Sequence, residues 1–332
     1  PHDYDGWRAL GNEGWSFGDV LPYFKKAENQ ERGGSAYHGA GGPLNVADLR
    51  SPNPLSRAFL EACAGAGIPR NDDFNGATQD GAGFYQVTQK GGKRCSAAGA
   101  YLRPVLGRPN LTVLTEAHAT RVLFEGTRAV GVAYLQEGQA RQARATGEVI
   151  LCGGAVNSPH LLLLSGVGPA VPLRQLGIPV VVDLPGVGRN LQDHLLTGVQ
   201  YVCTRALSLR RAESWGSLLM FLLFRRGPLT SNVAEAGAFV KTGPGLAAPD
   251  LQLIFAPTYY LDHGFTRPAG HGFSLGACIL RPESRGEIAL RSADPLTPPA
   301  VQPRYLESPA DLAVLCRGLE ITRAVGRAGA LD

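Results

Sequence analysis

The sequence lacks the patterns that mark several common classes of protein. Its six cysteines lie far apart and form no CxxC pair, so a zinc-binding or dithiol redox motif has no support. Its 32 basic and 28 acidic residues leave a net charge of only +4, which does not indicate a nucleic-acid-binding protein. Four histidines show no metal-ligand spacing, and we expect no metal site: His38, His118, His263 and His271.

Long hydrophobic runs are also missing. The longest apolar segments, 161–164 and 218–224, are far shorter than the roughly 20 residues of a membrane-spanning helix. We expect 218–224 to form a buried helix, with a lid or a membrane-surface segment as the alternatives. The chain begins at Pro1 without an initiator methionine, so targeting signals are not visible. We expect a cytoplasmic protein and leave membrane association open.

A hydrolase motif is absent, and the one dinucleotide-binding pattern does not fit a helix. No G-x-S-x-G elbow occurs, which argues against a serine hydrolase. Residues 243–248 match a dinucleotide-binding glycine pattern, but Pro244 and Pro249 prevent the helix that such a site needs. His194 follows Asp193 directly, and because sequence neighbours rarely face each other, a loop or capping role is a better interpretation than a general base.

The composition is that of a folded protein with more than one domain. The 332 residues are 44% hydrophobic and 18% charged, enough for two ordinary domains with a sizeable core. We expect a first segment over 1–93 and part of a nucleotide-binding α/β layer over 94–195. Residues 196–332 are expected to form an antiparallel sheet with a closing helix.

Local patterns predict the elements within these segments. Residues 16–28 are expected to form a capped helix with inward-facing aromatic side chains, 54–64 a second helix, and the glycine-rich 76–92 a loop. A helix start is predicted near 96–102 and a Ser-Pro-capped helix over 308–328. The predicted strands are 111–116, 120–126, 129–136, 147–152, 177–183, 197–204, 234–242, 250–257, 272–280 and 286–292. From 197 onward the strand spacing predicts an antiparallel sheet of about five strands.

One segment poses a functional question. Residues 147–152 predict a buried strand, and "GGAVNSPHLLLLSGVGP" (153–169) follows it directly. Glycines allow close approach of a ligand to the backbone. A helix beginning near Ser158 and Pro159 would offer unpaired N–H groups to a phosphate or ribose. Ordinary strand-to-helix architecture explains the same residues, so the two interpretations remain open at this point.

The details of that segment resemble the second signature of the glucose–methanol–choline family of flavin oxidoreductases. The matching residues are Gly154, Ala155, Ser158, Pro159, Leu161, Leu162, Ser165, Gly166, Val167 and Gly168. Segments 3–28, 92–104, 110–132, 186–195 and 280–295 resemble other blocks of the family in the same order. The resemblance covers essentially the whole chain and is strongest to alcohol and choline dehydrogenase-like members.

The resemblance implies a fold and a cofactor. The fold would combine α/β and α+β parts: a Rossmann-like FAD-binding domain interleaved with an antiparallel-sheet substrate domain. FAD-binding residues implied by the family motifs are Ala119, Gly153, Gly154, Ser158, Asn190, Asp193 and His194. Ala119 stands where relatives often carry valine, a change that a backbone contact tolerates. Phe255 and the aromatic segment around Tyr259 are candidates for a substrate pocket, although core packing explains them equally well.

The implied chemistry is oxidation of a primary alcohol to an aldehyde, with a histidine base and a hydride-accepting flavin. The electron acceptor would be a quinone, a dye or oxygen. The family's pyrophosphate-binding unit is expected before Pro1 and its catalytic histidine beyond Asp332, so no catalytic residue is assigned here. We therefore expect a fragment that is inactive alone. Alternatives are a non-catalytic remnant with a binding or structural role, an oxidase, and a hydroxynitrile lyase.

Overall fold

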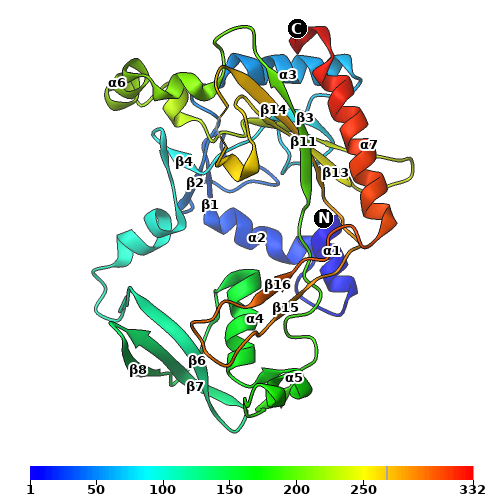
Figure 1. The fold of residues 1–332 in the computed structure, drawn as a ribbon. Helices are drawn as coiled ribbons and strands as arrows, with labels where there is room; N and C mark the ends of the chain where they lie inside the picture. The colour runs from blue at the N-terminus through cyan, green and yellow to red at the C-terminus, as the bar shows by residue number, and fades with distance from the viewer. Residues whose placement is uncertain (267, 332) are drawn as a thin grey trace. The chain divides into compact units, whose positions relative to one another are not determined.

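The computed structural model describes residues 1–266 and 268–331. The chain forms two compact units, shown with their elements in Figure 1. Unit 1 contains Pro1–Leu111, His194–Arg281 and Leu312–Asp332, and unit 2 contains Thr112–Asp193 and Pro282–Asp311. Both units are discontinuous in the sequence. The expected domains over 1–93, 94–195 and 196–332 stay a prediction.

Unit 1 is built on a five-stranded antiparallel sheet with the order β11-β14-β13-β12-β3. The strands are β3 (Gly81–Phe84), β11 (Leu196–Val202), β12 (Ala236–Val240), β13 (Leu251–Ala256) and β14 (Gly272–Ile279). The antiparallel sheet predicted for the last third of the chain is confirmed for β11 to β14. Its fifth strand comes from the segment predicted as a loop, and the predicted strand at 286–292 pairs elsewhere.

Two glycines explain why β3 was missed. A Cβ on Gly83 would lie 1.8 Å from the Asn71 carbonyl oxygen, and one on Gly81 would lie 2.7 Å from that of Pro69. The strand therefore requires glycine where the chain at Pro69–Asn71 crosses it closely. Glycine is rare in strands, so composition alone indicates a loop.

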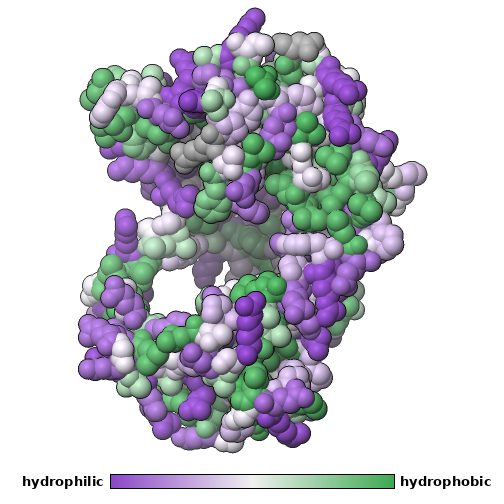
Figure 2. All heavy atoms as spheres, in the orientation of Figure 1, coloured by the Kyte–Doolittle hydropathy of each residue, from purple (hydrophilic) through white to green (hydrophobic). Residues whose placement is uncertain are grey.

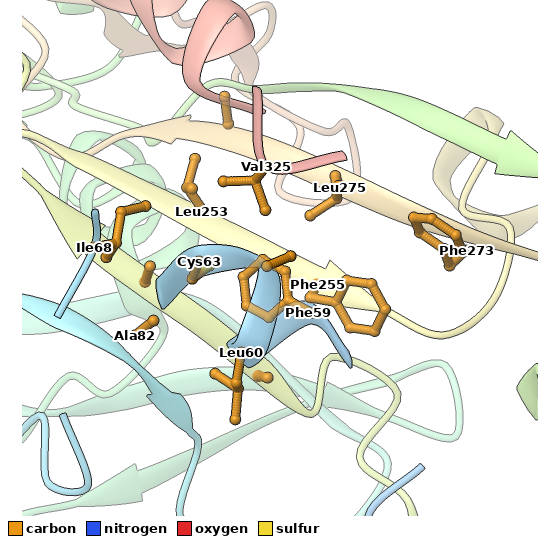
Figure 3. Packing of buried hydrophobic residues seen from close by; sticks show 14 of the residues in the cluster. Phe59, Leu60, Cys63, Ile68, Ala82, Leu253, Phe255, Phe273, Leu275 and Val325 are labelled. Carbon is orange, nitrogen blue, oxygen red and sulfur yellow. The ribbon is translucent and has the colours of Figure 1, made fainter. Parts of the chain in front are cut away.

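The core of unit 1 lies between this sheet and two helices, α3 (Pro54–Gly65) and α7 (Pro309–Gly326). Phe59 of α3 stacks on Phe255 of β13 with ring centroids 4.8 Å apart, and both rings are fully buried (Figure 3). Val325 of α7 packs into the same cluster. The helices predicted over 54–64 and 308–328 are confirmed.

Buried Glu235 ties α3 to the sheet. Its carboxyl group accepts hydrogen bonds from the Asn53 backbone N–H at 2.7 Å, the Ser56 hydroxyl at 2.7 Å and the Ser231 hydroxyl at 2.6 Å. Asn53 is also the N-cap of α3, accepting from the N–H of Leu55. Three donors on one buried carboxyl group satisfy it fully, as burial of a polar group requires.

Two helices of unit 1 differ from expectation in what they bury. α2 (Phe17–Ala27) has the predicted cap, a reciprocal pair between Ser16 and Asp19, but none of its aromatic side chains is buried. None of its residues is buried, and Tyr23 and Phe24 are exposed. The helix predicted to be buried at 218–224 forms as α6 (Trp215–Phe224), and only Ser217 of it is buried.

The other elements of unit 1 are short. The helix start predicted near 96–102 is a single π-helical turn at Ala98–Leu102. Further elements are α1 (His2–Ala9), the parallel pair β1 (Glu28–Gln30) and β2 (Leu44–Val46), the hairpin β4 (Gln89–Lys90) and β5 (Lys93–Arg94), and 3-10 turns at Arg103–Val105, Leu209–Glu213, Pro228–Thr230, Asp262–Gly264 and Gly329–Leu331.

Unit 2 combines a three-stranded antiparallel sheet with two helices. Its elements are β6 (Ala117–Glu125), β7 (Arg128–Gln136), β8 (Gln139–Arg144), α4 (Gly154–Leu164), the parallel pair β9 (Val167–Gly168) and β10 (Val182–Asp183), α5 (Ala170–Gln175), and the antiparallel pair β15 (Glu287–Ala289) and β16 (Ala300–Gln302). The Ser165 hydroxyl fastens α4 to β6, accepting from the Val122 N–H at 2.8 Å.

The strands predicted at 120–126 and 129–136 are confirmed as β6 and β7, whereas those at 111–116 and 147–152 are wrong. The segment 147–152 has a strand-like sequence, but no strand of residues 1–266 or 268–331 pairs with it, and Ile150 is 76% exposed. A strand needs a partner for its N–H and C=O groups.

Within residues 1–266 and 268–331, no helix is both long and apolar enough to cross a membrane.

Candidate functional site

A cavity of about 350 Å³ in unit 2 borders the start of α4 and the loop at 188–192. Its lining residues are Ala155, Pro159, Gly188, Arg189, Asn190, Leu191, Gln192 and Ile288. Ile288 belongs to β15, so the wall joins three segments that are distant in the sequence. The cavity lies at both glycine turns that sequence analysis singled out.

The start of α4 forms one side of the cavity. The helix begins at Gly154, four residues before the predicted start at Ser158 and Pro159. No side chain caps it; the Ser158 hydroxyl instead accepts from the N–H of Gly153 at 3.0 Å. Pro159 inside the helix has no N–H for the carbonyl of Ala155. Gly154 has a φ of +74°, and a Cβ there would meet nothing within 4 Å. The helix N-terminus is therefore open to a ligand.

The loop at 188–192 is fastened to β15. Gly188 and Ile288 form one backbone hydrogen bond of 2.6 Å, and Leu191 and Gly286 exchange two, of 3.0 and 2.8 Å. Gly188 has a φ of +80°, and a Cβ there would lie 2.2 Å from the Ile288 carbonyl oxygen. Asn190 also has a positive φ, 61°. The close approach and the backbone conformation together require glycine at 188.

Charged side chains stand around this loop. Glu287 accepts hydrogen bonds from Arg189 and, at 2.8 Å, from Arg304. The Tyr305 hydroxyl donates to Asp193. This hydrogen bond, burial and the charge of Asp193 together raise the pKa of Tyr305 to about 12. Tyr305 therefore keeps its proton at neutral pH and holds the Asp193 carboxylate in place.

Sequence reasoning missed Tyr305, Glu287 and Arg304. Glu287 and Tyr305 lie 98 and 112 residues from Arg189 and Asp193, their partners at the loop, and Arg304 contacts Glu287 rather than the loop. No local pattern connects such distant partners. The segment containing Glu287 was recognised as a family-like block, but not as a neighbour of the glycine turn.

His160 of α4 has His118 of β6 as a neighbour. Burial, and secondarily the neighbouring His118, lower the pKa of His160. His118 approaches the Pro295 carbonyl oxygen at 3.2 Å, whereas the Nε2 atom of His160 is buried with no hydrogen-bond partner. His160 is therefore an uncharged imidazole at neutral pH. Among residues 1–266 and 268–331, no group of three His, Cys, Asp or Glu side chains could hold a metal ion.

The structure brings together part of the predicted cofactor set. Asn190 lines the cavity, and Gly153, Gly154 and Ser158 flank Ala155 and Pro159 in its wall. Asp193 is held by Tyr305 at the end of the same loop. Ala119 is exposed on β6, next to a β-bulge. The cofactor assignments stay predictions.

The remaining candidates lie in unit 1. His194 is exposed at the boundary of that unit. Phe255 is fully buried against Phe59 and contacts the apolar core. Tyr259 is half-buried, and its hydroxyl donates to the His271 carbonyl at 3.1 Å. The assignment of Phe255 and Tyr259 to a substrate pocket stays a prediction, as does that of His194 to the cofactor.

Comparison with known proteins identifies the family. An alcohol dehydrogenase [acceptor] of Pseudomonas putida is 47% identical over 331 residues, covering 97% of this chain and 60% of that protein. Human mitochondrial choline dehydrogenase is 44% identical over 327 residues, covering 97% of this chain and 55% of the relative. The chain thus spans little more than half the length of these curated relatives.

A solved structure agrees with this result. The crystal structure of pyridoxine 4-oxidase from Mesorbium loti matches with a TM-score of 0.88 at 29% identity, covering 100% of this chain and 62% of that one. The predicted fold class is therefore confirmed. Family models described as GMC oxidoreductase match residues 1–196 and 282–331. The resemblance found in the sequence is confirmed: the chain belongs to the GMC oxidoreductase family.

Proposed function

We propose that this chain holds part of an FAD molecule in the unit 2 cavity and serves an alcohol-oxidising enzyme. The observation that carries this proposal is the cavity itself, which joins the open N-terminus of α4 to the loop at 188–192. Members of this family are FAD-dependent flavoproteins. The positive end of a helix dipole and its unpaired N–H groups favour a phosphate or ribose oxygen.

The residues present fit such a ligand. Gly154 leaves space above its Cα atom for close approach, and no side chain caps the helix. The backbone of Gly153 and Gly154 and the hydroxyl of Ser158 would hold the adenosine half. Asn190 and Asp193 would contact it from the loop. Ala119 of β6 would bracket the adenine through its backbone. His194, in unit 1, is proposed as a cofactor-binding residue from the family motif alone.

The proposed reaction is oxidation of a primary alcohol to an aldehyde. The bound flavin would supply a hydride acceptor for the alcohol carbon, and a general base would take the hydroxyl proton. The names of the two curated relatives, alcohol dehydrogenase and choline dehydrogenase, support a small alcohol as substrate and a separate electron acceptor. The sheet of unit 1, with Phe255 and Tyr259, is proposed as part of the substrate domain. The activity is proposed for a longer polypeptide that includes this chain.

The test starts at the gene. Sequencing the locus on both sides of this segment should show an in-frame G-x-G-x-x-G unit upstream and a histidine-bearing block downstream. The protein from the complete reading frame should purify with bound FAD and reduce a dye when a primary alcohol is added. The 332-residue chain alone should reduce none. Release of no flavin from the denatured complete protein would refute the cofactor proposal.

The products decide among the related activities. Reduced dye without peroxide indicates a dehydrogenase, hydrogen peroxide indicates an oxidase, and cyanide released from a cyanohydrin indicates a lyase. Start and stop codons that flank these 332 residues, with no dye reduction by the chain, would favour the binding or structural role. Alcohol-dependent dye reduction by the pure chain would show that the site is complete without further segments.

A further inference from the structure

We propose that α6 and its flanking arginines form a site that binds the surface of a lipid bilayer containing anionic lipids. The helix sequence is WGSLLMFLLF, and apolar side chains face outward around most of it. Four of them are between 55% and 65% exposed: Leu219, Leu222, Leu223 and Phe224. In Figure 2, hydrophobic atoms gather where Figure 1 draws α6. Contiguous exposed apolar side chains of this kind mark an interaction surface.

Charge complementarity indicates the kind of partner. Arg210 and Arg211 precede the helix and Arg225 and Arg226 follow it, whereas Glu213 is the one acidic residue within 209–226. Arg211 and Arg226 are exposed. An apolar helix with cationic residues at both ends matches a bilayer surface, where acyl chains lie beneath anionic headgroups.

The length of α6 fixes how it would lie. Ten residues make a helix of about 15 Å, half the thickness of a bilayer's hydrocarbon core, so α6 cannot span it. It would lie in the plane of the interface. Trp215, 85% exposed at the helix start, is the residue type that anchors proteins at the headgroup level.

The protein holds this helix in a defined position. The Ser214 hydroxyl caps it by accepting from the Ser217 N–H, and Arg225 ends it in the left-handed conformation. The Arg225 guanidinium lies 4.9 Å from the centre of the Phe221 ring. A Cβ on Gly227 would lie 2.7 Å from the Met220 sulfur, so the following turn packs closely against the helix. Because the surface is preformed, little ordering is needed when it binds.

A bilayer fits this surface better than a second copy of the chain. A two-fold dimer through α6 would place the same surface of both copies face to face. The arginines of each copy would then approach those of the other, and like charges brought together oppose association. The inference concerns the surface alone and does not depend on the proposed alcohol oxidation.

Vesicle co-sedimentation of the full chain tests the proposal. The vesicles are phosphatidylcholine, with and without phosphatidylglycerol. The chain should pellet with the anionic vesicles, and added salt should weaken the binding because it screens the arginines. The variant L219Q/L222Q/L223Q should not pellet. The control L10Q/V171Q/L296Q replaces equally apolar, exposed residues elsewhere and should pellet like the wild type.

A charge variant tests the second half of the site. Replacing Arg211 and Arg226 by glutamine should weaken binding to anionic vesicles about thirty-fold, at roughly fivefold per arginine. R141Q/R327Q removes the same charge from exposed sites elsewhere and should change binding little. Circular dichroism of each variant checks that the chain is folded.

Three outcomes would overturn the proposal. The first is failure of the folded wild-type chain to pellet with anionic vesicles. The second is equal binding by the α6 variant and its control. The third is a dimer in analytical ultracentrifugation that L219Q/L222Q/L223Q makes monomeric while no form binds vesicles, which would identify α6 as a contact between copies.

Discussion

Replacing Gly188 by alanine should disrupt the contact that closes the unit 2 cavity. The φ of +80° costs an alanine about 1–2 kcal/mol. Its Cβ would also lie 2.2 Å from the Ile288 carbonyl oxygen, and forcing an extra carbon into such a contact costs about 1–3 kcal/mol. The two effects sum to roughly 2–5 kcal/mol. The loop should move away from β15, opening the wall that we propose holds FAD.

Gly138 supplies the matched control. It lies between β7 and β8 with a φ of +75°, and a Cβ there would meet nothing within 4 Å. Gly138→Ala should therefore carry only the backbone cost of about 1–2 kcal/mol. The difference between the two variants isolates the contact with Ile288.

Hydrogen exchange measures the effect locally, which suits a chain with two compact units. In Gly188→Ala, the Ile288 amide, which donates to Gly188, should exchange faster than in the wild type and in Gly138→Ala. Urea denaturation followed by circular dichroism would supply the loss of stability. Equal exchange at Ile288 and equal stability loss in both variants would refute the reasoning.

Two further predictions concern unit 1. Phe255→Ala should lower the free energy of unfolding by about 3–5 kcal/mol because its ring is fully buried. The control Phe265→Ala, at an exposed position, should change it by no more than about 0.5 kcal/mol. Similar losses of unfolding free energy for both variants in urea denaturation would contradict the packing. Burial opposes protonation of His38, but hydrogen bonds to Glu28 and Asp73 outweigh it and raise its pKa above 6.5. This stabilisation is complete below pH 6.5 and disappears as pH rises through the raised pKa. The denaturation midpoint should therefore fall over that pH range, and His38→Gln should reduce the fall. An unchanged pH profile in the variant would exclude His38 as its source.

Sequence patterns predicted the parts of the fold that depend on local chemistry. Long strands such as β13 and β14, and the capped helices α3 and α7, follow from hydrophobic spacing and cap residues. β3 was missed because its glycines are required by the close approach of a neighbouring segment, Pro69–Asn71. The error at residues 147–152 is the opposite one. Their composition predicts a strand, but no strand among the described residues pairs with them.

The candidate site divides in the same way. The turns at Gly154 and Gly188 were visible because both positions have a positive φ, which favours glycine, and Gly188 also lies close to the Ile288 carbonyl. The start of α4 was misplaced, since a Ser-Pro pair usually begins a helix and here lies in its second turn. The Ser158 hydroxyl does not cap the helix; it accepts a hydrogen bond from the N–H of Gly153, five residues earlier.

No local sequence pattern predicts the side chains that contact the loop at 188–192 and the adjacent Asp193. Tyr305 holds Asp193 and Glu287 holds Arg189, each across about a hundred residues. Local composition indicates neither pair, because tyrosine and glutamate are common at protein surfaces. The family resemblance located the separate segments, and the fold supplies the reason that they occur together: the block at 280–295 contains the strand that closes the cavity against Gly188. A change at Ile288 or Glu287 should therefore act on the same site as a change at Gly188, although the sequence places them a hundred residues apart.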